Sequence, residues 1–542
     1  ALLPLLLAAC WGDAGGDGGA DIDEGVPEAE RYGGTAVVGA IGDIPDINPL
    51  TASDHTSAQV RMFVLYMPLL AYDENFEPIP NLARSWELNA DTSALTFHLR
   101  DDVYWHDGVK TTAYDVKFSY DLARDPNTAF PNTAFWTHYG AAEAVDSFTF
   151  RVAIEPHAEY LDPWRSFAPV PQHLLTGVAP AEIRNHPYST TRPVGNGPFK
   201  FVSRAVGQNW VFEANERHPE ELGGRPFLDR LVYRAIPETT SLLTELLTGS
   251  VDYYIAPGAN QAAQIEASPN ARLLSFPDRA FVILGWNQRR ELFQDVRVRR
   301  ALTMAIDRQA IVEGINYGYG QVANSTVPPF FWQYDAEAGS DLGYDPEAAR
   351  RLLAEAGWED RNGDGVIENQ QGQPFRFVIK TNQGNQTRAD IAAKVQADLR
   401  QVGVAAEPRI LEWGTLLNQL QTPDLRDFDA VIIGWVTEFR IDDTDLFHCD
   451  KRDDPFQWVG HCDPETDRLL EALPRIVDRE QAKPLWAEYQ RKIARAQPYT
   501  FLYFQERLEG VSERLRNVDP DARGDWVGAN KWWILPSARG NS

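Results

Sequence analysis

Residues 375–436 alternate between strand and helix patterns, and this alternation constrains the fold more than any other feature of the chain. Three apolar runs read as strands, and the two segments between them read as helices: "FRFVIKTN", "EPRILE" and "FDAVIIGW" around "TRADIAAKVQADLRQVG" and "WGTLLNQLQ". Such an order predicts a parallel α/β sheet covered on both faces. Ligands of these sheets bind beyond the carboxyl ends of the strands. The sequence therefore predicts a cleft between the loops "TNQGNQTR" and "VTEFRIDDTD".

Several side chains at these predicted strand ends are suited to ligand binding. The amide of Asn382 and the guanidinium of Arg388 belong to the first loop, which faces the acidic second loop. Trp435 ends the third strand and Trp413 begins the second helix. Aromatic rings in such places stack on sugar rings or on peptide side chains, although most of the 16 tryptophans are expected in the core.

Length and charge limit the class of protein. A chain of 542 residues predicts two or three domains, and 43% hydrophobic residues are enough to fold them. The 51 basic and 78 acidic residues give a net charge of −27. So acidic a surface repels phosphate backbones, which argues against a nucleic-acid partner. It is compatible with neutral or cationic ligands.

The first residues predict export. "ALLPLLLAAC" contains an apolar run far too short to span a membrane, and it resembles the end of a signal peptide. Leu7 to Cys10 resemble a bacterial lipobox, so Cys10 is predicted to carry a lipid anchor. Residues 1–10 are then a signal remnant and residues 11–30, rich in Gly, Asp and Ala, a flexible tether. An exported protein meets an oxidising environment.

Two His-Cys pairs, His448-Cys449 and His461-Cys462, allow three interpretations: a zinc site, a reactive thiol or a disulfide. Zinc ligands usually follow a C-x₂₋₄-C spacing, which these residues do not fit. The exported setting favours the disulfide, and the other two remain alternatives.

One loop resembles a calcium-binding sequence. In "EDRNGDGVIENQQ", Asp360, Asn362 and Asp364 occupy positions 1, 3 and 5 of an EF-hand-like loop, but Gln371 at position 12 cannot supply a bidentate carboxylate. Glu368 is a substitute ligand at position 9. A plain polar turn is the stronger interpretation. The sequence also lacks the common hydrolase, P-loop and dinucleotide motifs, and no cofactor is predicted.

The chain resembles family 5 of the extracellular solute-binding proteins of ABC importers, which includes peptide-, dipeptide- and nickel-binding lipoproteins. The resemblance extends from about Tyr32 to the C-terminus and rests on long runs in order: "INPL", "PNLARSWELNADTSALTFHLRDDVYWHDG", "RPVGNGPFKF", "TTSLLTELLTGSVD", "DVRVRRALTMAIDRQAIV", "YDPEAARRLLAEAGW", "ADIAAKVQADLRQVGV", "FDAVIIGW" and "AEYQRKIARAQPYTFLYF".

The resemblance implies an α/β, two-lobed periplasmic-binding-protein-like fold of type II, in the large cluster C form, that closes like a hinge. Lobe 1 would comprise 31–78, 195–284 and 507–542, with an extra subdomain at 79–194, and lobe 2 would comprise 285–506. "FVILGWNQ" and "YTFLYFQ" would be the crossovers.

The resemblance also implies site residues. Peptide-binding members hold the ligand's α-amino group with an aspartate after the strand that ends in Gly-Trp. Asp443 is the first choice here, with Glu438, Asp442 and Asp445 as alternatives. Arg388 would meet the ligand carboxylate. The loop after "INPL" adds candidates in Thr51, Ser53 and His55. Related members carry a closely spaced disulfide in this part of lobe 2, which corresponds here to Cys449 and Cys462.

The resemblance thus implies a monomeric, lipid-anchored, extracytoplasmic (periplasmic) protein without catalytic activity. It would capture a di- or oligopeptide between its lobes and deliver it to an ABC permease, which makes it a component of transmembrane transport. An oligosaccharide is the alternative ligand, and a nickel chelate a third. A secreted hydrolase with an unrecognised carboxylate pair is the alternative from a different class.

Overall fold

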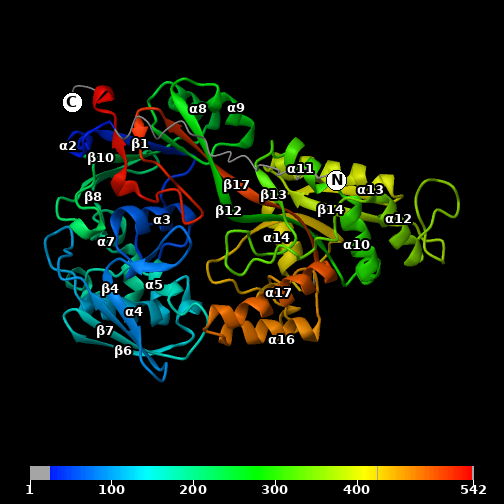
Figure 1. Cartoon of the computed structure of the whole chain (residues 1–542), viewed down its shortest axis with the longest axis horizontal. Helices are drawn as coiled ribbons and strands as arrows, with labels where there is room; N and C mark the ends of the chain where they lie inside the picture. Colours follow the sequence, from blue (N-terminus) through cyan, green and yellow to red (C-terminus); the bar gives the residue numbers. More distant parts are fainter. Residues whose placement is uncertain (1–24, 424, 540–542) are drawn as a thin grey trace, which may run out of the picture.

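A computed structural model describes residues 25–423 and 425–539, and an 11-stranded sheet runs through it (Figure 1). The strands follow the order β15 (Ala405–Leu411), β14 (Arg376–Asn382), β16 (Ala430–Val436), β12 (Ala271–Trp286), β17 (Tyr499–Ser512), β11 (Tyr253–Ile255), β1 (Thr35–Ala40), β10 (Arg230–Ala235), β9 (Asn209–Ala214) and β8 (Phe199–Ala205), with β13 (Gly320–Val322) beside β17.

The predicted α/β unit is confirmed at one end of this sheet. β14 pairs in parallel with β15 and with β16. The connecting helices are α13 (Gln386–Gln401) and α14 (Trp413–Gln421). Ile391, Val395 and Leu399 of α13 are fully buried, as their spacing predicts. Three further helices precede this unit, each capped by an aspartate side chain: α10 (Val296–Ala305), α11 (Arg308–Gly314) and α12 (Pro346–Glu355).

Two long strands, β12 and β17, join the two lobes. They pair with each other along most of their length. The later part of β12, from Ala280 on, pairs with β16 of lobe 2, whereas the later part of β17, from Glu509 on, pairs with β11 of lobe 1. A break in register between Pro277 and Phe281 marks the crossing. Residues 280–284, expected in lobe 1, thus pair with a strand of lobe 2; the other predicted boundaries stay predictions.

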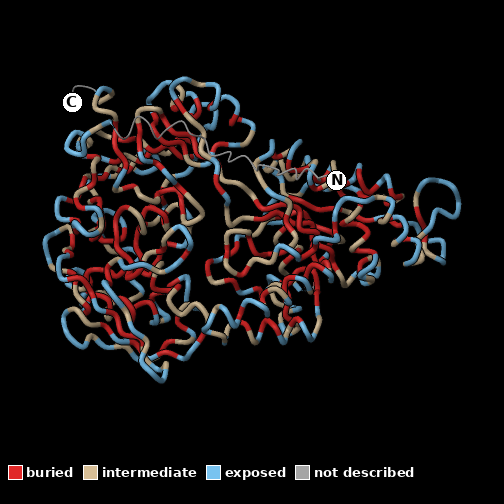
Figure 2. The backbone as a smooth tube through the Cα atoms, viewed as in Figure 1, coloured by how far each residue is buried: buried red, intermediate tan, exposed pale blue. Residues whose placement is uncertain are grey.

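Lobe 1 contains a second sheet within residues 79–194. Its strands follow the order β4 (Ala83–Leu88), β5 (Ala94–Leu99), β7 (Thr149–Ile154) and β6 (Tyr139–Asp146), and helix α4 (Ala113–Arg124) packs against them. Stacked and edge-on aromatic rings fill the space between sheet and helix, among them Tyr120, Phe150 and Trp164. Figure 2 shows buried segments along the central strands of both lobes.

Lobe 2 ends in a helical pair, α16 (Pro464–Ala472) and α17 (Arg479–Ala496). The shorter elements are α2 (Glu28–Arg31), β2 (Leu70–Tyr72), β3 (Pro78–Pro80), α3 (His55–Val60), α5 (Asp162–Ser166), α6 (Gln172–Leu175), α7 (Pro187–Thr190), α8 (Thr239–Leu247), α9 (Ala262–Glu266), α15 (Thr444–Phe447), β18 (Leu515–Arg516) and β19 (Trp533–Ile534). In the part of the chain that the structure describes, no helix is long and apolar enough to cross a membrane. Cys10 and most of the predicted tether lie outside the described residues.

Candidate ligand-binding site

Arg388 and Asn382 lie together at the carboxyl ends of the lobe 2 strands, as the sequence predicts. Asn382 is the last residue of β14, and Arg388 lies in the first turn of α13. The Arg388 Nη1 donates a hydrogen bond of 2.8 Å to Oδ1 of Asn382. Gly434 of β16 leaves room for the guanidinium, because a Cβ there would lie 3.0 Å from Nη2. The ends of β14 and β16 and the first turn of α13 therefore position a cation at the edge of the sheet.

The charge of Arg388 is not balanced by a protein carboxylate. Among the described residues, none brings a carboxylate within ion-pair distance of its guanidinium. Burial lowers the pKa of Arg388 from its usual value. A half-buried cation without a counter-ion has an uncompensated desolvation cost, which a bound anion reduces. Arg388 is therefore suited to form an ion pair with the carboxylate of a ligand.

Aromatic side chains lie at the same strand ends, on the face of the sheet opposite Arg388. Trp435, the penultimate residue of β16, stacks on Trp458 with 4.6 Å between ring centroids, and Phe456 lies 6.1 Å from it. Trp413 begins α14 and is 44% exposed. These rings give the edge of the sheet an apolar surface.

The loop after β16 presents an exposed carboxylate at Glu438. Its side chain is 82% exposed and lies 4.0 Å from Nη1 of Arg279. Asp442 is less exposed and faces Arg440, and Asp445 lies 3.6 Å from Nζ of Lys451. Each of the three carboxylates has a basic neighbour, and Glu438 is the most exposed of them, which makes it the most accessible to a ligand ammonium group.

Asp443, the first choice from the sequence, is buried within lobe 2, and its role in ligand binding stays a prediction. Its side chain is buried, and its Oδ2 accepts hydrogen bonds from Oγ1 of Thr326 at 2.5 Å and from the hydroxyl of Tyr489 at 2.7 Å. Burial raises the pKa of Asp443 to about 6. These two bonds connect the acidic loop to Thr326 and Tyr489 of lobe 2.

Lobe 1 contributes a charged network around His55. His55 begins α3, is exposed, and places Nε2 3.3 Å from Oδ2 of Asp525. Asp525 also pairs with Arg507 of β17 at 2.5 Å, and Arg507 pairs with the buried Glu509 at 3.1 Å. Burial raises the pKa of Glu509 well above its usual range.

The other two candidates in this loop differ in exposure. Ser53 is exposed, whereas Thr51 is buried and donates a hydrogen bond of 2.6 Å to Asp46. Ser53 and His55 therefore remain accessible from solvent, and Thr51 supports the loop from inside.

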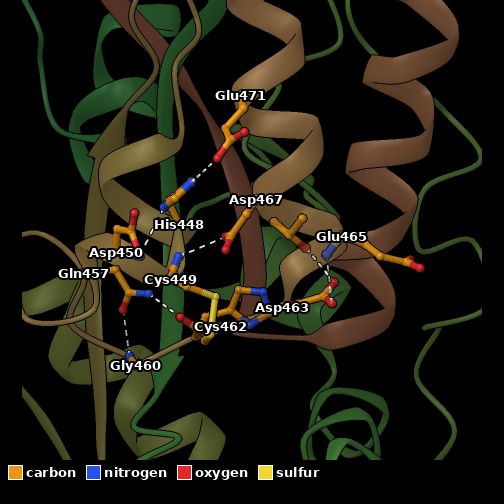
Figure 3. Close-up of a disulfide and its surroundings, with 12 residues drawn as sticks. His448, Cys449, Asp450, Gln457, Gly460, Cys462, Asp463, Glu465, Asp467 and Glu471 are labelled. Carbon is orange, nitrogen blue, oxygen red and sulfur yellow. Dashed lines mark hydrogen bonds and ion pairs between the residues drawn. A yellow bond between two sulfur atoms is a disulfide. The ribbon is translucent and has the colours of Figure 1, made fainter.

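A disulfide joins Cys449 and Cys462, as predicted (Figure 3). The neighbouring histidines do not converge on a shared site. His448 faces Glu471, whereas His461 is buried, and burial lowers its pKa to about 4. The zinc and reactive-thiol interpretations therefore do not hold.

The disulfide closes a loop that carries Phe456 and Trp458. Nη1 of Arg289 donates to the carbonyl of Trp458, and Arg426 donates to the carbonyls of Asp454 and Gln457. Since Trp458 stacks on Trp435, the closed loop supports the aromatic part of the site.

Replacing Cys449 and Cys462 together by serine should lower the free energy of unfolding by about 3 kcal/mol, because the bridge restricts the unfolded chain. Urea denaturation of the variant and of the parent under non-reducing conditions measures the difference. Equal stability of the two proteins would show that the bridge does not form.

The calcium-like loop brings its acidic groups together. Ligand atoms of Asp360, Asp364 and Glu368 lie within 4.8 Å of one another. The Asp360 carboxylate also accepts hydrogen bonds from the amides of Gly363 and Gly365, and the amide of Asn362 donates to Glu368. These bonds account for the loop without an ion, and calcium binding stays a prediction.

Three charged residues near the crossovers were missed by sequence reasoning: Arg279, Arg507 and Asp525. Arg279 precedes the lobe 2 part of β12, where its Nη1 donates to the carbonyl of Thr437 at 2.9 Å. Arg279 and Arg507 lie in the sequence two residues from the predicted crossover segments "FVILGWNQ" and "YTFLYFQ", and this position is the signal that could have indicated them.

Comparisons with known proteins agree with this architecture. The profile of the bacterial extracellular solute-binding proteins, family 5, middle region, matches residues 77–453. The oligopeptide-binding protein AppA of Bacillus subtilis is 32% identical over 98% of this chain and 97% of its own length. The dipeptide-binding protein of Escherichia coli is 24% identical over 90% of this chain and 92% of its own.

Solved structures agree as well. AppA of Bacillus subtilis in complex with a nonapeptide superposes with a TM-score of 0.75 and 31% identity, covering 93% of this chain and 99% of that one. The substrate-binding protein CtaP of Listeria monocytogenes, 20% identical, shares the fold with a TM-score of 0.83, covering 93% of this chain and all of that one. The chain belongs to family 5 of the bacterial extracellular solute-binding proteins.

Proposed function

We propose that this protein captures a di- or oligopeptide between its lobes and delivers it to an ABC permease. The observation that carries the proposal is the presence of two separate, opposite charges at the carboxyl-end edge of the lobe 2 sheet. Arg388 offers a cation without a carboxylate partner among the described residues, and Glu438 offers an exposed anion. A peptide with free ends carries the two complementary charges.

The remaining surface fits a ligand of varied sequence. Trp435 and Trp413 offer apolar faces, and polar groups of the cleft can reach ligand side chains through water. The relatives that match along most of this chain are named as oligopeptide- and dipeptide-binding proteins, which supports the same ligand class here. Binding alone is proposed, with no chemical step.

Calorimetric titration tests the ligand class. Protein freed of bound ligand by unfolding and refolding is titrated with peptides of two to nine residues and with cello-oligosaccharides. We expect peptides to bind, and to raise the stability by about 2.7 kcal/mol at 100 times the dissociation constant. Binding of the sugars alone, or cleavage of either ligand, would contradict the proposal.

We also propose that Cys10 carries a lipid that holds the protein at the outer face of the cytoplasmic membrane, where it acts as a monomer. The lipobox-like "LAAC" and the match to an extracellular family support this. Metabolic labelling with palmitate should mark the parent protein and leave a Cys10→Ser variant unlabelled. Equal labelling of both would place the lipid elsewhere.

A further inference from the structure

The lobes meet a second time, on the side of the molecule away from the crossover strands. Figure 1 shows the subdomain that contains α4 and β6 next to helices α16 and α17, while β12 and β17 cross at the other side. A backbone hydrogen bond of 2.7 Å joins the amide of Ala158 in the subdomain to the carbonyl of Pro474 in lobe 2. The space between the lobes is thus bounded by the crossovers at one side and by this contact at the other.

An ion pair forms the polar half of the contact. Arg479, the first residue of α17, donates from Nε and Nη2 to the two carboxylate oxygens of Glu159, both at 2.9 Å. Its Nη1 donates to Glu77. The Arg479 and Glu159 side chains are only 25% and 15% exposed. A bidentate, largely buried pair of this kind is stronger than an ordinary surface salt bridge.

Aromatic rings form the apolar half. Phe76 of lobe 1 lies 5.4 Å from Phe330 and 5.3 Å from Phe331 of lobe 2, so that it belongs to the core of the opposite lobe. Phe439, from the loop that also carries Glu438, packs 5.5 Å from Phe76. The guanidinium of Arg165 in the subdomain lies 3.7 Å from the Phe439 ring. The contact therefore reaches the loop of the candidate site.

The lobe 1 residues of the contact hold a costly backbone conformation. Phe76 has φ of 61° and Glu159 has φ of 52°, in the left-handed region that non-glycine residues rarely adopt. Such strain persists only where surrounding contacts maintain it, and it collects at clamps and switches. The side chains of both residues contact lobe 2. Turn hydrogen bonds within lobe 1, from the amide of Phe76 to Asp73 and from the amide of Asp162 to Glu159, also support their backbone.

We propose that Arg479, with Glu159 and Glu77, is a positioning residue that sets ligand affinity by holding the lobes closed, without touching the ligand. A two-state protein binds its ligand less tightly in proportion to the fraction of the competent state. Loss of the ion pair lowers the closed fraction and weakens every ligand by the same factor. Measurements of peptide affinity in the variants rest on the proposed peptide function. The radius of gyration of the ligand-free protein does not depend on it.

The variants Arg479→Gln, Glu159→Gln, the double variant and the charge exchange Arg479→Glu with Glu159→Arg test the proposal. We expect each single variant to raise the dissociation constants of two unrelated peptides by about tenfold each, leaving their ratio unchanged. The double variant should be no worse than the singles, and the exchange should recover part of the loss. Arg468→Gln is the control, because it removes an exposed ion pair with Glu488 inside lobe 2.

Small-angle scattering of the ligand-free proteins gives the second readout. The radius of gyration should increase in the single variants and stay at the parent value in Arg468→Gln. An unchanged radius in Arg479→Gln would overturn the proposal, and so would a changed ratio between peptides, which would place Arg479 at the ligand. If the parent binds no peptide, the proposed function fails, while the radius still decides the role of the ion pair.

Discussion

Replacing Glu438 with glutamine should weaken binding of a peptide with a free α-amino group by about 2 kcal/mol, roughly 30-fold. The change removes the negative charge and keeps the size of a side chain that is 82% exposed and lies in the loop after β16. The ligand ammonium would then enter the cleft without a charged partner. Calorimetric titration of parent and variant with one peptide measures the effect.

The matched control is the same peptide with an acetylated amino end. It carries no ammonium group, so the parent and the Glu438→Gln variant should bind it equally. If the variant lost the same factor with both peptides, Glu438 would act by some route other than recognition of the α-amino group. An Asp445→Asn variant, whose carboxylate already faces Lys451, should bind both peptides as the parent does.

Replacing Asp443 with asparagine should change how stability depends on pH. The carboxyl of Asp443 titrates near 6 in the folded protein because burial disfavours its charge, whereas the ordinary value is 3.8. As pH rises from about 4 to 6, the unfolded state loses this proton first, so the folded protein loses stability through that window. The gap between the two values corresponds to about 3 kcal/mol.

The asparagine variant lacks this titration. The free energy of unfolding of the variant minus that of the parent should therefore increase by up to about 3 kcal/mol between pH 4 and pH 7.5. This increase does not depend on the size of the difference at pH 4. Urea denaturation at both pH values gives the comparison. Asp442→Asn serves as the comparison variant, because it removes a neighbouring carboxylate that is partly exposed. If the difference in the free energy of unfolding between the Asp443→Asn variant and its parent were the same at both pH values, burial would not raise the pKa of Asp443 in the folded protein.

The α/β unit of lobe 2 could be predicted because its information is local. The apolar face of α13, the glycine that follows it and the strand runs on either side all lie within neighbouring residues. The same locality placed Asn382, Arg388 and Trp435 at one edge, since parallel strands bring their carboxyl ends together. These residues lie where the periodicity of the sequence indicates.

The choice among the acidic residues of the second loop depended on distant contacts. Asp443 is buried because Thr326 and Tyr489, far away in the sequence, both donate to it. No local pattern distinguishes such a carboxylate from the exposed Glu438 five residues earlier. The pair of Arg479 with Glu159 is separated by 320 residues and leaves no signal in one sequence.

Mass spectrometry of the purified protein tests the central claim most directly. The protein is isolated under native conditions without added ligand, its intact mass is compared before and after denaturation, and the released molecules are fragmented. We expect one ligand per protein chain, and we expect the fragments to be peptides with free amino and carboxyl ends. Release of an oligosaccharide or a metal chelate in that same ratio, with no peptide, would contradict the account.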